Sequence, residues 1–283
     1  MTDALHDAVT DDHSDSLIDW TDAFENGAYI PGAAGLRDEW PKRAAAFRAS
    51  QPEAKLGVTY GEGARQTYDL FPAAQSPGTV IFVHGGYWHQ TDISWWSHLA
   101  SGAKARGWSV ALAGYTLAPQ ATIPTITGEI AAAVTAIAER HPGPLRLAGH
   151  SAGGHLVSRM LCPGILSEAV AARIAQVVSI SGVHHLVPLT KAAMNTTLGL
   201  TADTARAESP ALLPPRVGAR ATFWVGAGER PEFLRQTRMI TERWAEAGAA
   251  VRDVYAPGEN HFSVIDALSD PESPLISALL SDQ

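Results

Sequence analysis

The segment Gly149-His150-Ser151-Ala152-Gly153 follows an apolar stretch and precedes a helix-compatible one. A strand, Gly-x-Ser-x-Gly and a helix in this order predict a nucleophile elbow, a turn so sharp that its serine adopts a strained backbone conformation. The two glycines lack a Cβ, which lets the strand and the helix approach closely. A pattern with three defined positions also arises by chance, so its weight depends on the motifs around it. With that support, Ser151 is predicted to be a nucleophile whose Oγ stands clear of a sheet.

Short apolar segments rich in β-branched residues alternate with helical segments along most of the chain. Continuous apolar runs of this kind are typical of strands that are buried on both faces of a parallel sheet. The expected strands cover 79–83, 108–113, 145–148, 174–179, 221–225 and 251–255, and the expected helices cover 94–105, 125–140, 151–160 and 232–247. Two alternating segments, 55–60 and 66–71, predict an edge hairpin. The fold class is therefore α/β, with a mostly parallel, twisted sheet and helices on both faces.

The length of 283 residues suits one domain over 17–283, preceded by a polar, flexible N-terminal tail over 1–16. A helix is expected to begin near Asp38, with Pro41 in its first turn. Residues 183–216 interrupt the alternation of strands and helices and are rich in loop-forming residues. Because insertions at the carboxyl edge of such a sheet often cover a site, this segment is predicted to be a small lid, with a plain surface loop as the alternative.

The net charge of −8 gives no electrostatic reason to expect nucleic acid or an anionic membrane as a partner. No signal peptide pattern and no membrane-spanning apolar run is visible. Cys162 is the single cysteine, which excludes an intramolecular disulfide and fits a cytoplasmic protein. Its expected role is that of a buried structural thiol. His84 and His89, five residues apart in a loop, do not have a convincing metal-ligand spacing, so no metal and no cofactor is expected.

A second glycine motif, His84-Gly85-Gly86, follows the first expected parallel strand directly. An H-G-G sequence at this point is typical of the loop that stabilises an oxyanion with backbone N–H groups. The expected donors are the N–H groups of Gly85, Gly86 and Ala152, the last being the residue after the nucleophile. The alternative is a plain strand-to-loop turn. The predicted elbow some 65 residues later favours the oxyanion loop over this alternative.

A serine nucleophile needs a base, and the base needs a carboxylate that orients it. In this architecture the chain order is Ser, acid, His. His261 follows the last expected strand in a Gly/Asn-containing loop and is the expected base. The acid is open: Glu229 lies in the loop after the preceding strand, Glu232 should occupy the first turn of the next helix, and Asp253 lies inside a strand. Glu229 is preferred among the three.

These motifs together resemble the kynurenine formamidase (arylformamidase) branch of the α/β-hydrolases. The resemblance rests on 84–88 (HGGYW), 149–155 (GHSAGGH) and 259–262 (ENHF), with softer matches at 19–20, 29–31, 115–119, 208–210 and 231–233. The elbow and the H-G-G motif are shared by many esterases, and the Tyr-Trp after H-G-G is the more specific sign. Glu229 departs from the family, which commonly has Asp there. A second, metal-dependent type of formamidase carries an H-x-G-T-H motif that is not seen here.

The resemblance implies hydrolysis of N-formyl-L-kynurenine to L-kynurenine and formate in tryptophan catabolism, by a Ser151–His261–Glu229 triad. A formyl group is small, so selectivity should come from the aromatic amine side. Tyr87, Trp88 and Phe262 are expected to contact the substrate, with core packing as the alternative for Trp88 and His184 of the lid as a further candidate. A general carboxylesterase or, less expected, a non-catalytic binding protein of the same fold are the alternatives. Exposed Trp and Pro residues could form a homodimer interface.

Overall fold

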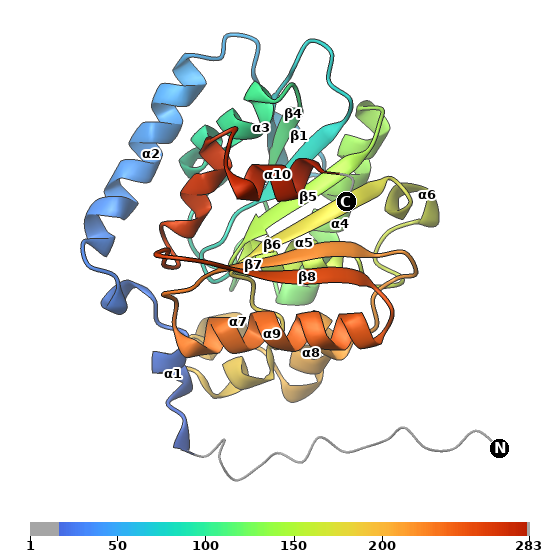
Figure 1. Ribbon diagram of the computed structural model, residues 1–283. Coiled ribbons are helices and arrows are strands. Elements are labelled where there is room, and N and C mark those ends of the chain that lie inside the picture. The colour runs from blue at the N-terminus through green and yellow to red at the C-terminus, as the bar shows by residue number, and fades with distance from the viewer. Residues whose placement is uncertain (1–16, 282–283) are drawn as a thin grey trace, which may run out of the picture.

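A computed structural model describes residues 17–281, so the expected tail over 1–16 lies outside the described residues. One eight-stranded sheet runs through this part of the chain in the order β1-β2-β4-β3-β5-β6-β7-β8 (Figure 1). Its strands are β1 (Lys55–Thr59), β2 (Thr67–Phe71), β3 (Thr79–Val83), β4 (Ser109–Ala113), β5 (Leu145–His150), β6 (Ile174–Ile180), β7 (Arg220–Gly226) and β8 (Ala250–Ala256). The β1–β2 and β2–β4 pairs are antiparallel and the other pairs are parallel. The expected α/β fold with a mostly parallel sheet and an edge hairpin is confirmed.

The continuous apolar strands face two separate hydrophobic cores. Successive side chains of a strand point to opposite faces of a sheet. On β3, Val80 and Phe82 accordingly lie in one core while Ile81 and Val83 lie in the other. All five residues of β3 and of β4 are buried. A strand between two cores needs apolar side chains on both of its faces, which is why the sequence shows runs and not alternation.

Helices cover both faces of the sheet. The longer ones are α2 (Ala33–Ala49), α4 (Ile123–Arg140), α5 (Ala152–Arg159), α9 (Pro231–Glu246) and α10 (Pro274–Leu280). The shorter ones are α1 (Trp20–Ala23), α3 (Ser101–Ala105), α6 (Glu168–Ala171), α7 (Asn195–Leu198) and α8 (Ala202–Ala207), and the 3-10 turns are η2 (Gly27–Tyr29), η3 (Ile93–Trp95), η4 (Ser97–Ala100), η5 (Val187–Lys191), η6 (Pro210–Leu212) and η7 (Val264–Ser269). Helices α4, α5 and α9 bury apolar side chains in one core, and α2, α3 and α10 in the other. None of the helices within 17–281 is long and apolar enough to cross a bilayer.

Helix α2 begins earlier than the sequence pattern predicts. It starts at Ala33, directly after Gly32, which has a φ of 74°. Pro41 therefore lies inside the helix and not in its first turn. A proline in a helix interior removes one backbone hydrogen bond and disfavours the helix by about 3 kcal/mol. Packing offsets this effect, since Trp40 buries its ring against Trp96 with 4.8 Å between the ring centroids.

The prediction of a single helix over 94–105 is also wrong. That segment forms three short pieces, η3, η4 and α3, with Trp96 between the first two and no gap between the last two. Asp92 begins the first piece by accepting a hydrogen bond from the Ser94 N–H at 3.0 Å. A side chain that competes with the backbone for local hydrogen bonds favours short turns over one regular helix.

Residues 183–216 fold into η5, α7, α8 and η6 and contribute apolar side chains to the core on the α4, α5 and α9 side. In Figure 1 this segment lies beneath the sheet, beside α9. Leu186, Leu189 and Ala205 are each at most 1% exposed. Most of the apolar area that this segment could offer to a ligand is thus already used in packing.

The expected surface of exposed tryptophans is not present. Seven of the eight tryptophans are buried and Trp95 is half-buried. The large apolar side chains that are exposed among the described residues are Leu17, Ile18, Tyr29, Leu56 and Val217. The exposed-Trp argument for a homodimer interface therefore fails.

Several buried histidines are held neutral, and this predicts acid sensitivity. Burial lowers the pKa of His84, His98 and His155 to about 4 and that of His184 to about 3, from a usual value of 6.5. Below pH 6.5 the unfolded chain binds protons that the folded chain refuses, so the free energy of unfolding should fall as the pH drops from about 7 towards 4. Denaturant titrations at pH 7 and pH 5 measure this loss.

His98 provides the control, because neither ring nitrogen has a hydrogen-bond partner among the described residues. His98→Phe keeps an aromatic ring and removes the titrating group. One such histidine contributes up to about 2 kcal/mol of the loss. The variant should therefore lose less stability than the parent between pH 7 and pH 5, and an identical loss in both proteins would contradict the explanation.

Candidate active site

Ser151 lies at the carboxyl end of β5, near the middle of the sheet. Its backbone has φ 55° and ψ −116°, a combination that a non-glycine residue adopts only under strain. Two backbone hydrogen bonds hold this conformation: the Ser151 N–H donates to the carbonyl of Ile180 at 2.8 Å, and the His155 N–H donates to the carbonyl of Ser151 at 3.1 Å. The predicted strand–turn–helix elbow is therefore present, with α5 beginning at the residue after the serine.

The elbow packs against the end of β3 through Gly153. A Cβ at this position would lie 2.0 Å from the carbonyl oxygen of Val83 and 2.7 Å from that of His84. No side chain fits such a gap without moving the backbone. The glycine therefore brings the start of α5 against the chain as it leaves β3, where the His84-Gly85-Gly86 segment begins.

The peptide groups of this segment are oriented by hydrogen bonds to their carbonyls. Tyr115 donates its hydroxyl proton to the His84 carbonyl at 3.1 Å. Thr91 donates its hydroxyl proton to the Gly85 carbonyl at 2.9 Å. In a trans peptide the C=O and the following N–H point in opposite directions, so each bond also aims the N–H of Gly85 or Gly86. These two N–H groups are among the donors that the sequence predicts for an oxyanion.

His84 adds a third contact to this loop. Its Nδ1 lies 2.8 Å from the Gly85 carbonyl, which can only accept, so Nδ1 carries the proton. The imidazole stacks on Tyr115 with 4.4 Å between ring centroids, and burial keeps it neutral. No sequence pattern indicated a role for Thr91, and Tyr115 occurred only within a softer match. Their roles come from contacts between segments that no local pattern describes.

His261 and Glu229 are in direct contact. The Nδ1 of His261 lies 2.6 Å from Oε2 of Glu229, and both side chains are almost completely buried. The other carboxylate oxygen accepts hydrogen bonds from the Gly226 N–H at 2.8 Å and from the Ser181 hydroxyl at 2.5 Å. The Glu229 side chain thus folds back over the turn at the end of β7, which accommodates the methylene by which Glu exceeds Asp.

The other two candidate acids lie elsewhere. Glu232 forms an ion pair with Arg235 at 2.7 Å and accepts a hydrogen bond from Gln236 in the first turns of α9. Asp253 accepts a hydrogen bond from the Tyr255 hydroxyl at 2.8 Å. Of the three carboxylates, Glu229 is the one that touches His261.

His150, inside the elbow, supports the backbone of His261. Its Nε2 donates to the His261 carbonyl at 2.9 Å, and the two rings lie 4.7 Å apart between centroids. Burial, and then the neighbouring His261, lower the pKa of His150 well below its usual range. A neutral His150 avoids placing a second cation beside the imidazole that must accept a proton.

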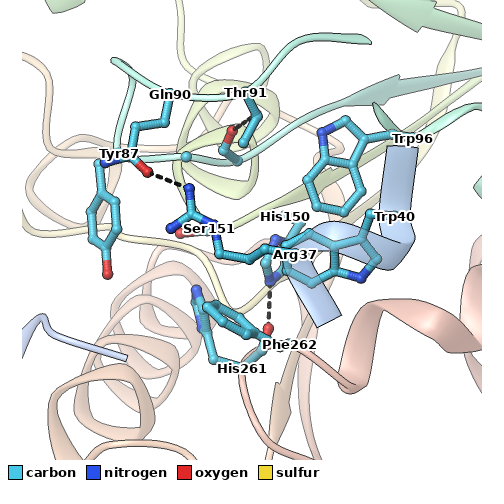
Figure 2. Close-up of a pocket in the computed structure, with 12 residues that line it drawn as sticks. Arg37, Trp40, Tyr87, Gln90, Thr91, Trp96, His150, Ser151, His261 and Phe262 are labelled. Carbon is cyan, nitrogen blue, oxygen red and sulfur yellow. Dashed lines mark hydrogen bonds between the residues drawn. The ribbon is translucent and has the colours of Figure 1, made fainter. Parts of the chain in front are cut away.

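Ser151 and His261 line the same cavity, which opens to solvent (Figure 2). Its other lining residues are Arg37, Trp40, Gly85, Gly86, Tyr87, Gln90, Thr91, Trp96, His150 and Phe262. Tyr87 and Phe262 line it as expected. Among the described residues, Ser151 Oγ makes no hydrogen bond. A hydrogen bond between a serine nucleophile and its base often forms only when substrate binds. The described residues contain no cluster of three or more His, Cys, Asp or Glu side chains that could hold a metal.

Trp88 does not line this cavity, which corrects the expectation that it contacts substrate. Its side chain is 1% exposed and donates its Nε1 proton to Nδ1 of His155 at 3.3 Å. His155 in turn donates from Nε2 to the Glu208 carbonyl at 2.7 Å, so these residues join the loop after β3 to α5 and the segment before η6. His184 is likewise fully buried against Phe223, away from the cavity.

The outer wall of the cavity comes from a different element than the sequence predicts. No residue of 183–216 lines it, whereas Arg37 and Trp40 of α2 and Trp96 after η3 do. Trp40 packs edge-on against Phe262 with 5.2 Å between centroids. Helix α2 carried no site motif in the sequence, so its place at the cavity depends on this long-range aromatic packing.

A family model for the alpha/beta hydrolase fold matches residues 80–264, which is more than half of the chain. The chain belongs to this family. Among curated relatives, kynurenine formamidase of Danio rerio is 28% identical over 235 residues, covering 80% of each chain. Kynurenine formamidase of Drosophila melanogaster is 27% identical over 240 residues, covering 77% of this chain and 80% of that one. The resemblance seen in the sequence is thereby confirmed.

Solved structures include a close match to this chain. A crystal structure of a protein from Silicibacter sp. TM1040, proposed to be a thioesterase, has a TM-score of 0.90 and 47% identity, covering 93% of this chain and 100% of that one. Esterase B from Lactobacillus rhamnosis has a TM-score of 0.61 and 19% identity, covering 85% and 89%. The second likeness supports the fold alone.

Replacement of the carboxylate in contact with His261 should impair the hydrolase severely. In Glu229→Gln an amide replaces the acceptor of the Nδ1 proton, so the imidazole loses its preferred tautomer and kcat should fall by roughly 10³–10⁴. Glu232→Gln is the matched control and should keep kcat within a few-fold. Steady-state kinetics on any turned-over ester distinguish the two, and a larger loss in Glu232→Gln would transfer the role to that residue.

Removal of the hydrogen bond to the Gly85 carbonyl should lower kcat without affecting substrate binding. Thr91→Val keeps the branched shape and removes the hydroxyl that donates to this carbonyl, so the N–H of Gly86 is less well aimed. We expect kcat to fall about tenfold or more, because deletion of an oxyanion donor costs about 10²–10³. Thr91→Ser retains the hydroxyl and should retain most of kcat. Equal activity in Thr91→Val and the parent would show that the contact does not matter.

Proposed function

We propose that this hydrolase cleaves N-formyl-L-kynurenine to L-kynurenine and formate, with Ser151 as nucleophile, His261 as base and Glu229 as the orienting acid. The observation that supports the reaction best is the 2.6 Å contact of Glu229 with His261, whose ring lines the same cavity as Ser151. Support for the substrate comes from relatives named kynurenine formamidase that align over about four fifths of both chains.

The first half of the reaction forms a formyl-enzyme. His261 Nε2 takes the proton of Ser151 Oγ while the oxygen attacks the formyl carbon. The resulting oxyanion accepts hydrogen bonds from the N–H groups of Gly85, Gly86 and Ala152. His261 then gives its proton to the arylamine nitrogen, the C–N bond breaks and the amine leaves.

Water completes the cycle. His261 removes a proton from the water, whose oxygen attacks the formyl-serine, and the same N–H groups hold the second oxyanion. Return of the proton to Ser151 Oγ releases formate. Glu229 stays ionised throughout and stabilises the imidazolium that forms in each half.

Substrate selection falls to the outer part of the cavity. A formyl group needs little room beside Ser151, whereas the aromatic amine must lie against Tyr87, Trp40, Trp96 or Phe262. Such rings offer large apolar area with defined orientation, which suits a planar leaving group.

Hydrolysis of esters or thioesters is the second candidate. It is favoured by the 47% identical structure of a protein proposed to be a thioesterase and by the esterases that share the fold. The same Ser151, His261 and N–H donors would act on an ester, so the two candidates differ in leaving group and not in mechanism.

The discriminating measurement is kcat/KM for N-formyl-L-kynurenine against p-nitrophenyl acetate and a short acyl thioester. We expect a strong preference for the formamide, lost in Ser151→Ala. Ester or thioester turnover without formamide turnover would contradict the proposed substrate while leaving the nucleophile in place.

A fluorophosphonate probe separates a catalyst from a non-catalytic binding protein. The parent should be labelled at Ser151, whereas Ser151→Ala and His261→Asn should not react. Absence of labelling in folded parent protein would argue against a serine hydrolase altogether.

A further inference from the structure

The cavity beside Ser151 has an uneven charge distribution. Its lining contains no carboxylate, and its one permanently charged side chain is Arg37. His150, also in the lining, is held neutral by burial. The whole chain has a net charge of −8, which would repel an anionic ligand at long range. The positive charge at the cavity therefore attracts an anion locally, whereas the overall charge of the protein repels it.

Arg37 is exposed and reaches the cavity from α2. In Figure 2 its side chain extends from the helix toward Gln90, and its guanidinium donates a hydrogen bond to Oε1 of Gln90 at 3.0 Å. Arg37 and Trp40, three residues apart, share one face of the helix. Trp40 is fixed by its contacts with Trp96 and Phe262, so the backbone that carries Arg37 is also fixed.

The charge of Arg37 is not neutralised within the described residues. Its hydrogen-bond partner is a neutral amide, and no ion pair between residues 17 and 281 includes it. Arg43, two turns further along α2, shows the usual alternative: its guanidinium pairs with Asp266 at 2.9 Å. A single bond to Gln90 uses one of the five N–H donors of Arg37 and leaves others for a ligand.

We propose that the guanidinium of Arg37 binds a carboxylate carried by the leaving-group portion of the substrate. This inference rests on the proposed formamidase function, because a formyl group has no atoms on which to carry a second charge. The preferred substrates are then aromatic formamides with an anionic side chain, held between the aromatic wall and Arg37.

A planar guanidinium matches a carboxylate through two parallel charged hydrogen bonds, which a neutral carboxamide cannot reproduce. Gln90 holds the guanidinium at the cavity before substrate arrives, so less side-chain freedom is lost on binding. A hydrogen bond to a charged group is worth roughly a tenfold to a hundredfold in kcat/KM.

The test compares N-formyl-L-kynurenine with its carboxamide, which keeps the formanilide, the ketone and the ammonium group. The parent should prefer the carboxylate by roughly tenfold to a hundredfold in kcat/KM, mainly through KM. Arg37→Gln should lose this preference, with its kcat/KM for the carboxylate falling to about its own value for the carboxamide, and Arg37→Lys should recover part of it. Arg43→Gln, on the same helix but outside the cavity lining, should retain the full preference.

Failure of this inference can be told apart from failure of the proposed function. If the parent cleaves both formamides equally, or if Arg37→Gln keeps the preference, the carboxylate site is overturned while the formamidase stands. If neither formamide is cleaved, the proposed function fails, and 3-acetoxybenzoate against 3-acetoxybenzamide tests the site on esters. An Arg37-dependent preference for the benzoate would support the site, and its absence would overturn it.

Binding gives a second readout that does not need turnover. In Ser151→Ala, 2-aminobenzoate should bind more tightly than 2-aminobenzamide, and Arg37→Gln in that background should remove the difference. Calorimetry at low and high salt should show a weaker preference at high salt, since the Arg37 side chain is exposed. Equal affinity for the two ligands at low salt would count against the proposal.

Discussion

The contact between Gly153 and the carbonyls that end β3 is the constraint on which the site depends. With 2.0 Å between a notional Cβ and the Val83 oxygen, the start of α5 and the loop after β3 form one packed unit. The strained turn at Ser151 belongs to the same unit. Any shift of α5 would therefore move the serine and the neighbouring N–H donors together, which keeps their relative positions while other parts of the cavity change.

Around this unit the polar groups hold one another in place. Tyr115 and Thr91 fix the carbonyls of His84 and Gly85, and His150 fixes the backbone of His261. Buried polar groups are expensive to leave without partners, so such a network favours a single arrangement. Neutral histidines suit this role, because each ring can donate from one nitrogen without adding charge near His261. The same burial makes the fold sensitive to acid.

The inner and outer parts of the cavity come from different regions of the chain. The inner part is built at the carboxyl ends of β3, β5, β7 and β8, where parallel strands bring their following loops together. The outer part comes from α2 and the turn after η3, held by contacts among Trp40, Trp96 and Phe262. In the proposed function the leaving group lies against the outer part, so substitutions in α2 would alter its surroundings without touching the elbow.

Local sequence patterns were enough to predict the sheet, the elbow, the glycine loop and His261, because buried strands are continuous apolar runs and sharp turns need glycine. It narrowed the acid to three carboxylates, of which the fold places Glu229 against His261. The folded chain was needed to show that Pro41 lies inside α2, that Trp88 is buried against His155, and that α2 and not 183–216 lines the cavity. These outcomes depend on contacts between residues far apart in the chain, such as Trp40 with Phe262, whose packing outweighs the local preferences that a sequence displays.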